Sequence, residues 1–168
     1  MPGLNDMMTT HMQTGRPLPA LEWVMTLEVT VAAVDLGECT DGRRSNYPIL
    51  GGRFEGPAIR GRVLAGGADF YRQRADGVGE LDARYSLQTD QGELINVHNT
   101  GLLVLSEQGR ALEAQGHWPL DPAHYRCTCT PRFQVPLGRL AWLSQGTFIG
   151  RALYPASDQV VIHCYRLA

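Results

Sequence analysis

The sequence predicts an all-β protein, an antiparallel closed β-barrel of about eight to ten strands with one short helix. Short stretches in which apolar and polar residues alternate recur along most of the chain, and this period of two is typical of half-buried strands. The 168 residues include 19 glycines and 10 prolines, which place turn signals at short intervals. A barrel is preferred to a two-sheet sandwich because closure removes exposed sheet edges.

The first half of the chain contains several of these strands. They are expected at residues 21–34, 47–50, 59–64, 68–74 and 81–89. In the first of them, apolar side chains from Trp23 to Val31 alternate with Glu and Thr. A Gly- and Arg-rich loop is expected at residues 37–46, and the paired Gly51 and Gly52 allow bends or close approach of two backbones.

The second half contains the predicted helix and the remaining strands. Ser106 can cap a helix that begins at Glu107, and Gly116 marks its end. The strands are expected at residues 93–97, 125–135, 140–149 and 159–166. We therefore expect a single barrel domain at residues 21–168, preceded by a flexible N-terminal arm at residues 1–20.

Composition excludes several classes of function. All 15 basic residues are arginine, which excludes Schiff-base chemistry and a phosphate-loop lysine. A formal net charge of -2 provides no attraction to nucleic acid or to an anionic membrane. Neither a dinucleotide-binding G-x-G-x-x-G before a helix nor a G-x-S-x-G nucleophile motif is present. With no secretory or membrane-spanning segment visible, we expect a cytoplasmic protein with no cofactor and no nucleic-acid or membrane partner.

A metal site is a weaker interpretation of the cysteine and histidine residues. The residues that it would use are His117, His124, Cys127, Cys129, His163 and Cys164. Cys127 and Cys129 lie on one face of a predicted strand, but zinc sites usually use pairs spaced C-x₂₋₄-C, and no second pair follows at a suitable distance. We therefore interpret these thiols as small buried side chains and predict no metal.

Paired charges on one strand are the first candidates for a functional site. Alternation in residues 81–89 places Asp82, Arg84 and Ser86 on one face of the strand, and Leu81 and Tyr85 on the other. In one interpretation the charged face meets water and its ions pair weakly. In the other, on which our site assignment depends, this face points into the barrel, where buried charges persist only when paired or used.

Arg53 and Glu55 repeat the same spacing. Inside a barrel, Arg53 or Arg84 could bind a carboxylate through two parallel hydrogen bonds. Asp82 or Glu55, kept protonated by apolar surroundings, could act as a general acid. The aromatic residues expected to line the same cavity and to stack on an aromatic ligand are Tyr85, Phe133 and Trp142.

Several of these motifs together resemble a bacterial domain-of-unknown-function family of small β-barrels. The residues that carry the resemblance are Gly51–Pro57, Gly61–Phe70, Asp76–Val78, Leu81–Tyr85, Thr130–Phe133, Ala141–Leu143 and Phe148–Gly150. The resemblance extends from Leu21 to the C-terminus. That family includes hydroxylaminobenzoate lyase, which converts para-hydroxylaminobenzoate into protocatechuate and ammonia during nitroaromatic degradation.

The resemblance implies a cofactor-independent lyase that acts on a small aromatic carboxylate. Arg53 or Arg84 would hold the carboxylate, and Asp82 or Glu55 would protonate the departing hydroxyl. Tyr85, with Phe133 and Trp142, would stabilise the electron-poor ring. Two alternatives are a non-catalytic carrier or sensor of a small hydrophobic acid, and a structural barrel with no cavity above about 300 Å³. We also expect a homodimer, the commonest soluble assembly.

Overall fold

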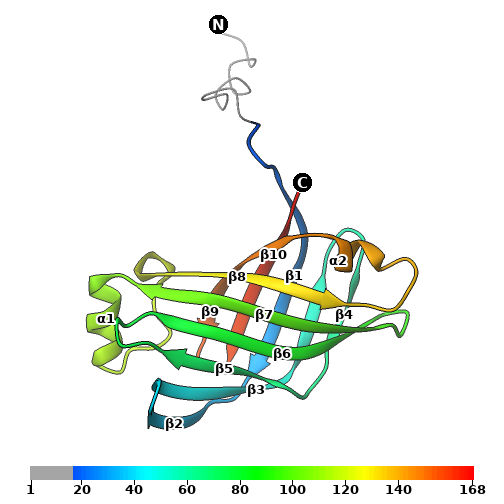
Figure 1. Ribbon diagram of the computed structural model, residues 1–168. Coiled ribbons are helices and arrows are strands. Elements are labelled where there is room, and N and C mark those ends of the chain that lie inside the picture. The colour runs from blue at the N-terminus through cyan, green and yellow to red at the C-terminus, as the bar shows by residue number, and fades with distance from the viewer. Residues whose placement is uncertain (1–16) are drawn as a thin grey trace, which may run out of the picture.

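Ten antiparallel strands form one sheet that closes into a barrel (Figure 1), which confirms the predicted fold class. The computed structural model describes residues 17–168, so the predicted arm at 1–20 lies mostly outside the described residues. The strands are β1 (Leu21–Val31), β2 (Val34–Cys39), β3 (Gly42–Glu55), β4 (Arg60–Val63), β5 (Ala68–Gln73), β6 (Gly79–Thr89), β7 (Leu94–Leu105), β8 (Tyr125–Gln134), β9 (Phe148–Ala156) and β10 (Gln159–Leu167). The helices are α1 (Glu107–Ala114) and α2 (Ala141–Gln145), with a 3₁₀ turn at Pro122–His124.

The sheet runs around the barrel in the order β1, β10, β9, β8, β7, β6, β4, β3, β2, and pairing of β1 with β3 closes it. Two positions around the barrel are each shared by two strands. Between β3 and β6, one end is occupied by β4 and the other by β5. Along the other edge of β3, β1 pairs with one part of the strand and β2 with the other. The result is an eight-position barrel built from ten strands.

Gly52 allows the two backbones to approach where the barrel closes. It pairs with Val29 of β1 and has a φ of +143°. A Cβ atom at this position would lie 2.0 Å from the carbonyl oxygen of Glu28, much closer than two such atoms can approach. The close backbone approach that the paired glycines predict is therefore present at Gly52, at the closing seam of the barrel.

Two sequence predictions of local structure are wrong. Residues 37–46 do not form a loop, since β2 and β3 continue through them and turn at Thr40 and Asp41. Residues 140–149 do not form one strand either, because they fold as α2 and only then enter β9. Burial explains this helix, since Leu140 and Leu143 are both 1% exposed and form part of the core.

The predicted helix is confirmed as α1. The side chain of Ser106 accepts a hydrogen bond from the N–H of Gly109, which satisfies one of the free donors of the first turn. Glu107 lies in that first turn, where its charge is favourable. The helix covers one end of the barrel (Figure 1).

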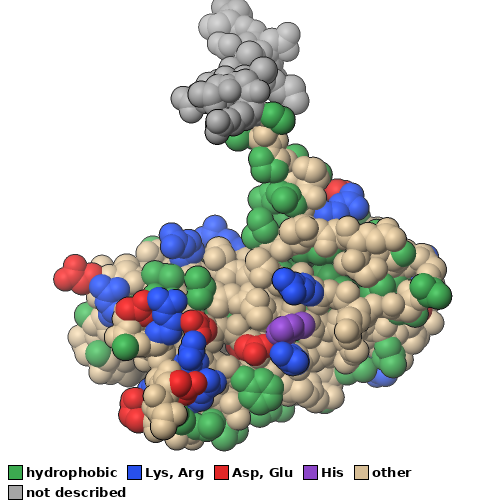
Figure 2. Space-filling view, in the orientation of Figure 1, with side chains coloured by type: hydrophobic (Ala, Val, Ile, Leu, Met, Phe, Trp, Pro, Cys, Tyr) green, Lys and Arg blue, Asp and Glu red, His purple; other side chains and the backbone are tan. Residues whose placement is uncertain are grey.

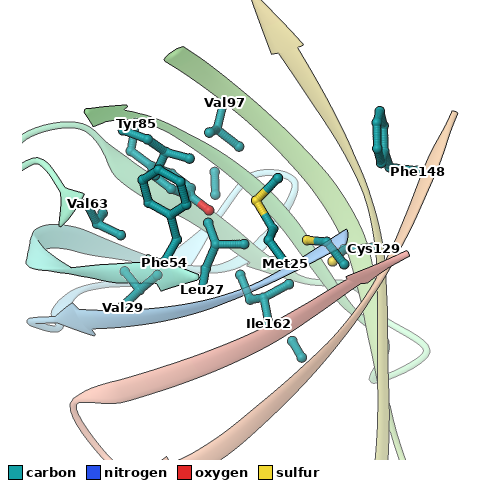
Figure 3. Close-up of a cluster of buried hydrophobic side chains, with 14 of the residues drawn as sticks. Met25, Leu27, Val29, Phe54, Val63, Tyr85, Val97, Cys129, Phe148 and Ile162 are labelled. Atoms are coloured by element: carbon teal, nitrogen blue, oxygen red, sulfur yellow. The ribbon is translucent and has the colours of Figure 1, made fainter. Parts of the chain in front are cut away.

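Apolar side chains fill much of the interior. Met25, Leu27, Phe54, Leu87 and Ile95 are almost completely buried, and Figure 3 shows several members of this cluster between the strands. Outside, charged side chains are spread over β5, β6 and β7 (Figure 2). No helix within residues 17–168 has the length and apolar character needed to span a membrane.

Replacing Gly52 should destabilise the barrel by more than about 1 kcal/mol, because alanine there meets both an unfavourable φ and the Glu28 carbonyl. Urea unfolding of the Gly52→Ala variant checks this. Gly66→Ala is the matched control, since Gly66 also has a positive φ, +122°, but nothing lies within 4 Å of its added Cβ. If both variants lose the same free energy of unfolding, the requirement for glycine at position 52 comes from its positive φ and not from the close approach at the seam.

Candidate functional site

A cavity of about 250 Å³ lies inside the barrel beneath α1. Inward-facing residues of β1, β3, β5, β6, β7, β9 and β10 form its wall. Glu113, Gly116, His117 and Trp118 lie at the α1 end, where Gly116 and His117 are exposed. This volume is below the range of about 300–1,000 Å³ that is usual for small-molecule sites, so this cavity meets the condition given above for the structural alternative. An apolar cavity of about 150 Å³ is nevertheless large enough to bind benzene. The space therefore suits a ligand with a single ring.

Strand register places four cavity residues in one row across the sheet. Tyr47 of β3 pairs with Asp69 of β5, Asp69 pairs with Ala83 of β6, and Ala83 pairs with Asn99 of β7. All four line the cavity. Ala83, whose side chain is the smallest of the four, lies between Asp69 and Asn99 in this row.

Asp69 is held at an interruption in the β5–β6 ladder. Asp69 pairs with Ala83, and the pairing resumes at Arg72 with Glu80. Between these pairs, the N–H of Asp82 donates a hydrogen bond to Oδ1 of Asp69, at 2.8 Å. Burial raises the pKa of Asp69 to about 6; this hydrogen bond acts to lower it and the negative charge of Asp82 to raise it further. The carboxyl can therefore give or take a proton near neutral pH.

Asn99 is the second polar group of the row. It is 4% exposed and its Nδ2 donates to Sγ of Cys129, at 3.3 Å. Within the described chain, its Oδ1 is buried without a hydrogen-bond partner. Buried acceptors in folded proteins nearly always have a donor, so this oxygen is an exception within residues 17–168.

Aromatic rings form much of the remaining wall. Tyr47 and Tyr71 pack edge to face with ring centroids 6.1 Å apart, and Trp118 lies 5.1 Å from Tyr154. Burial raises the pKa of Tyr47, Tyr71, Tyr85 and Tyr154, so their hydroxyls stay protonated. Such rings provide faces and edges on which an aromatic ligand can stack.

The ionisable groups in this wall are mostly acidic. Besides the tyrosines they are Asp69, Glu113 and His117, and no arginine is among the cavity residues that the structure describes. Close behind the wall are the thiols of Cys127 and Cys129, whose pKa values burial raises to about 12 and about 11. Cys127 contacts the Tyr154 hydroxyl at 3.3 Å. The cavity wall that the structure describes therefore provides no arginine to bind a carboxylate.

The prediction that Asp82 and Arg84 face the interior is wrong. Their side chains are 46% and 65% exposed on the outer face of β6, 3.6 Å apart, and Asp82 also contacts Nε2 of His98 at 2.8 Å. The physical reason is that the other face of β6, which carries Ala83 and Tyr85, is the apolar one and is buried. An outward position removes the argument by which these two residues were assigned to the site.

Arg53 and Glu55 also point away from the interior. Arg53 is 72% exposed and forms two hydrogen bonds to Glu28 across the seam, at 2.8 and 2.9 Å, while Glu55 is exposed. The cause is again alternation, because Phe54 between them takes the inward position. Neither of the arginines expected to bind the benzoate, Arg53 or Arg84, lines the cavity.

Of the predicted aromatic residues, Tyr85 lines the cavity, and Phe133 and Trp142 do not. Those two pack against Phe148, with centroids 5.1 and 6.2 Å from its ring, near α2. The structure therefore does not bring the predicted site residues together. The roles proposed for them remain sequence-based predictions.

Sequence reasoning missed Asp69 and Asn99. For Asn99 a signal exists, because Ile95, Val97 and Leu103 mark the inward face of β7 and Asn99 interrupts it with a polar residue. For Asp69 the signal is weaker, because both faces of β5 mix polar and apolar side chains. A polar residue at an inward position is more informative here than a pair of charges.

Comparisons with known proteins place the chain in a family. Residues 19–167 match the family described as "Protein of unknown function (DUF3237)". A UPF0311 protein from Rhodopseudomonas palustris (strain TIE-1) is 35% identical over 156 residues, which cover 89% of this chain and 98% of that protein. The crystal structure of a conserved protein of unknown function from the same species aligns with a TM-score of 0.82 at 32% identity, covering 91% of this chain and all of the other.

A more distant likeness concerns the fold alone. A crystal structure described as an enzyme from Penicillium herquei aligns with a TM-score of 0.65 at 21% identity, covering 91% of this chain and 98% of the other. The resemblance to a family of small β-barrels without an assigned function, inferred from the motifs, is confirmed. The match over nearly the whole barrel shows that this chain belongs to the DUF3237 family.

Proposed function

We propose that this protein is a cofactor-independent lyase that binds a small aromatic molecule in the cavity beneath α1. Asp69 donates a proton to the group that leaves. The specific reaction is the one that the sequence resemblance implies, conversion of para-hydroxylaminobenzoate into protocatechuate and ammonia. The Penicillium herquei chain described as an enzyme supports the idea that this fold can carry catalysis.

The observation that carries the proposal is the carboxyl of Asp69 in the wall of a cavity with several aromatic side chains. Burial there raises its pKa to about 6. Loss of hydroxyl from an aromatic hydroxylamine needs a proton on the departing oxygen. A group with this pKa is partly protonated near neutral pH and is strong enough as an acid to give the proton up. Asp69 thus takes the role that the sequence analysis gave to Asp82 or Glu55.

The reaction balances without an oxidant or a reductant. The N–O bond breaks, its electron pair leaves with the oxygen, and the proton from Asp69 completes a water molecule. One water then adds to the electron-poor ring, and a second hydrolyses the carbon–nitrogen bond, which releases ammonia. Because one water is formed and two are used, one water is consumed overall. Tyr47, Tyr71 and Tyr85 line the cavity, and their raised pKa values keep them neutral. In the proposed reaction, their electron-rich rings stabilise the electron-poor ring of the substrate.

A second candidate function is a non-catalytic carrier or sensor. The position of the cavity inside the barrel and its mainly apolar wall favour this alternative, since both features suit retention of an apolar ligand. The two functions differ in one measurable way, because a carrier binds the molecule and releases it unchanged.

Purified protein should release ammonia from para-hydroxylaminobenzoate, and Asp69→Asn should lower kcat by about 100-fold or more, since a general acid contributes about 10²–10⁴-fold. Ammonia is measured with a coupled enzymatic assay. Asp82→Asn is the matched control, because it keeps the backbone N–H that Asp69 accepts from, and it should retain most of the activity. Binding without ammonia release would support the carrier, and loss of activity in Asp82→Asn alone would restore the sequence-based assignment.

The rate should fall as the pH rises. Because the protonated form of Asp69 acts and its pKa is about 6, kcat/KM should be level below about pH 5 and decrease about tenfold per pH unit above about pH 7. A pH–rate profile checks this, with circular dichroism at each pH to confirm that the protein is folded. A rate that rises through the same range would mean that the ionised carboxylate acts as a base.

Asp69 should also lower the stability of the folded protein at neutral pH. Its folded pKa of about 6 is above the ordinary value of 3.8, so the folded state holds the proton more tightly and loses relative stability as the pH rises from about 4 to about 6. Asp69→Asn removes this cost and still accepts the Asp82 hydrogen bond. Its free energy of unfolding in urea should exceed that of wild type by up to about 3 kcal/mol at pH 7 and by little at pH 4. A less stable variant at pH 7 would show that the ionised carboxylate stabilises the fold.

A further inference from the structure

A groove of about 980 Å³ crosses the outer surface of the barrel, over β6, β7 and β8. It runs between the turn at residues 64–67, which joins β4 to β5, and the end of α2 near Ser144. Its volume is at the upper end of the range of about 300–1,000 Å³ that is usual for small-molecule sites. No acidic residue is among the groove residues that the structure describes. The described wall of this groove therefore has no carboxylate that would repel a negatively charged molecule.

Strand register places two arginines and a histidine in one row of this groove. Arg84 of β6 pairs with His98 of β7, and His98 pairs with Arg132 of β8. All three line the groove from outward positions of their strands, and Figure 2 shows basic side chains and a histidine together on this face. Neighbouring strands are about 5 Å apart, so about 10 Å separates the Cα atoms of Arg84 and Arg132. Two arginine side chains are long enough to reach one small anion above His98.

This row of charges is unfavourable for the sheet alone, because like charges directly opposite one another on neighbouring strands are destabilising. Asp82, at the edge of the groove, offsets part of the charge, since its Oδ1 lies 3.6 Å from Nε of Arg84 and 2.8 Å from Nε2 of His98. Within residues 17–168, no carboxylate forms an ion pair with Arg132. An anion bound between the two arginines removes the repulsion that remains.

A row of uncharged polar side chains lies beside the charged one in the same groove. Oγ of Ser86 donates a hydrogen bond to Oδ1 of Asn96 at 2.9 Å, and Nδ2 of Asn96 donates to Oε1 of Gln134 at 3.2 Å. These bonds orient both amides. Each amide NH₂ group carries two hydrogens, so each keeps at least one N–H beyond these bonds. Such donors suit the hydroxyl oxygens of a bound molecule.

Two arginines in one row suit a phosphate group better than a carboxylate. A guanidinium binds either anion through two parallel N–H···O bonds. One arginine therefore satisfies both oxygens of a carboxylate. A phosphate monoester has three terminal oxygens and a charge of about -1.5 to -2 at neutral pH, so it has an oxygen and a charge left for a second arginine.

We propose that this groove binds a phosphate monoester with a hydroxyl-bearing body, of the sugar phosphate class. Arg84 and Arg132 bind the phosphate from either side of His98, and the amides of Asn96 and Gln134 bind hydroxyl groups of the body. The outward side chains that form this site are separated by the sheet from the cavity beneath α1. The inference does not depend on the proposed lyase reaction.

Equilibrium binding of three probes tests this proposal without any turnover. The probes are glucose 6-phosphate, inorganic phosphate and the dicarboxylate succinate, measured by isothermal titration calorimetry at about pH 7.5. Salt at about 0.15 M limits non-specific attraction between charges more than about 8 Å apart. Glucose 6-phosphate should bind most tightly, and succinate should bind about tenfold or more weakly than it, the value expected for one hydrogen bond to a charged group. Absence of binding by both phosphate compounds, or succinate binding as tight as glucose 6-phosphate, would overturn the proposal.

Two variants and one control locate the site. Arg84→Gln and Arg132→Gln should each weaken binding of glucose 6-phosphate by about tenfold or more. Arg126→Gln is the matched control, because Arg126 is also an exposed arginine on the outer face of β8, but it pairs with Val104 and does not line the groove. It should bind the probe as wild type does. Equal losses of affinity in Arg126→Gln and Arg132→Gln would mean that overall charge, and not this row, attracts the phosphate.

Stability separates a binding role for Arg132 from a structural one. Without ligand, Arg132→Gln should unfold at a urea concentration at least as high as wild type, because it removes a repelling charge. Glucose 6-phosphate should raise the urea midpoint of wild type and leave that of Arg132→Gln nearly unchanged. A marked loss of stability in the variant without ligand would show that Arg132 supports the fold. Phosphate binding without ammonia release from para-hydroxylaminobenzoate rejects the lyase and retains this inference, and the opposite result does the reverse.

Discussion

Pairing of β1 with β3 is the constraint on which the rest of this structure depends. It converts a long antiparallel sheet into a closed surface with an inside, and Gly52 permits the required approach of the two backbones. Once the sheet is closed, alternation assigns every second side chain to the interior. The position of each functional group then follows from its register relative to this seam.

Side-chain packing differs between the two parts of the barrel interior. Large apolar side chains such as Phe54 and Leu87 are packed tightly, whereas Ala83 and the surrounding tyrosines leave a cavity beneath α1. Asp69 and Asn99 line this space. Its surroundings disfavour the charged form of Asp69, and Oδ1 of Asn99 has no hydrogen-bond partner within residues 17–168. Polar groups that weaken a fold and converge on a cavity are characteristic of a binding site.

The fold was largely predictable, and the candidate site was not. Alternation and turn residues predicted an all-β barrel and the capped helix at Ser106, but they did not predict α2, whose formation depends on burial of Leu140 and Leu143 against the core. For the site, the charges of Asp82 and Arg84 were a poor guide, because charges at alternate positions of a strand usually mark the face exposed to water. Tyr85 was found because it shares the apolar face of the same strand.

Local sequence pattern is sufficient to show which residues share a face of each strand, since side chains alternate with a period of two in any extended chain. It is also sufficient to exclude lysine-dependent chemistry, because the chain contains no lysine. Tertiary structure alone decides which residues from different strands meet. The row from Tyr47 through Asp69 and Ala83 to Asn99 arises from the register of four strands, and register depends on the closure of the whole sheet and on no single segment.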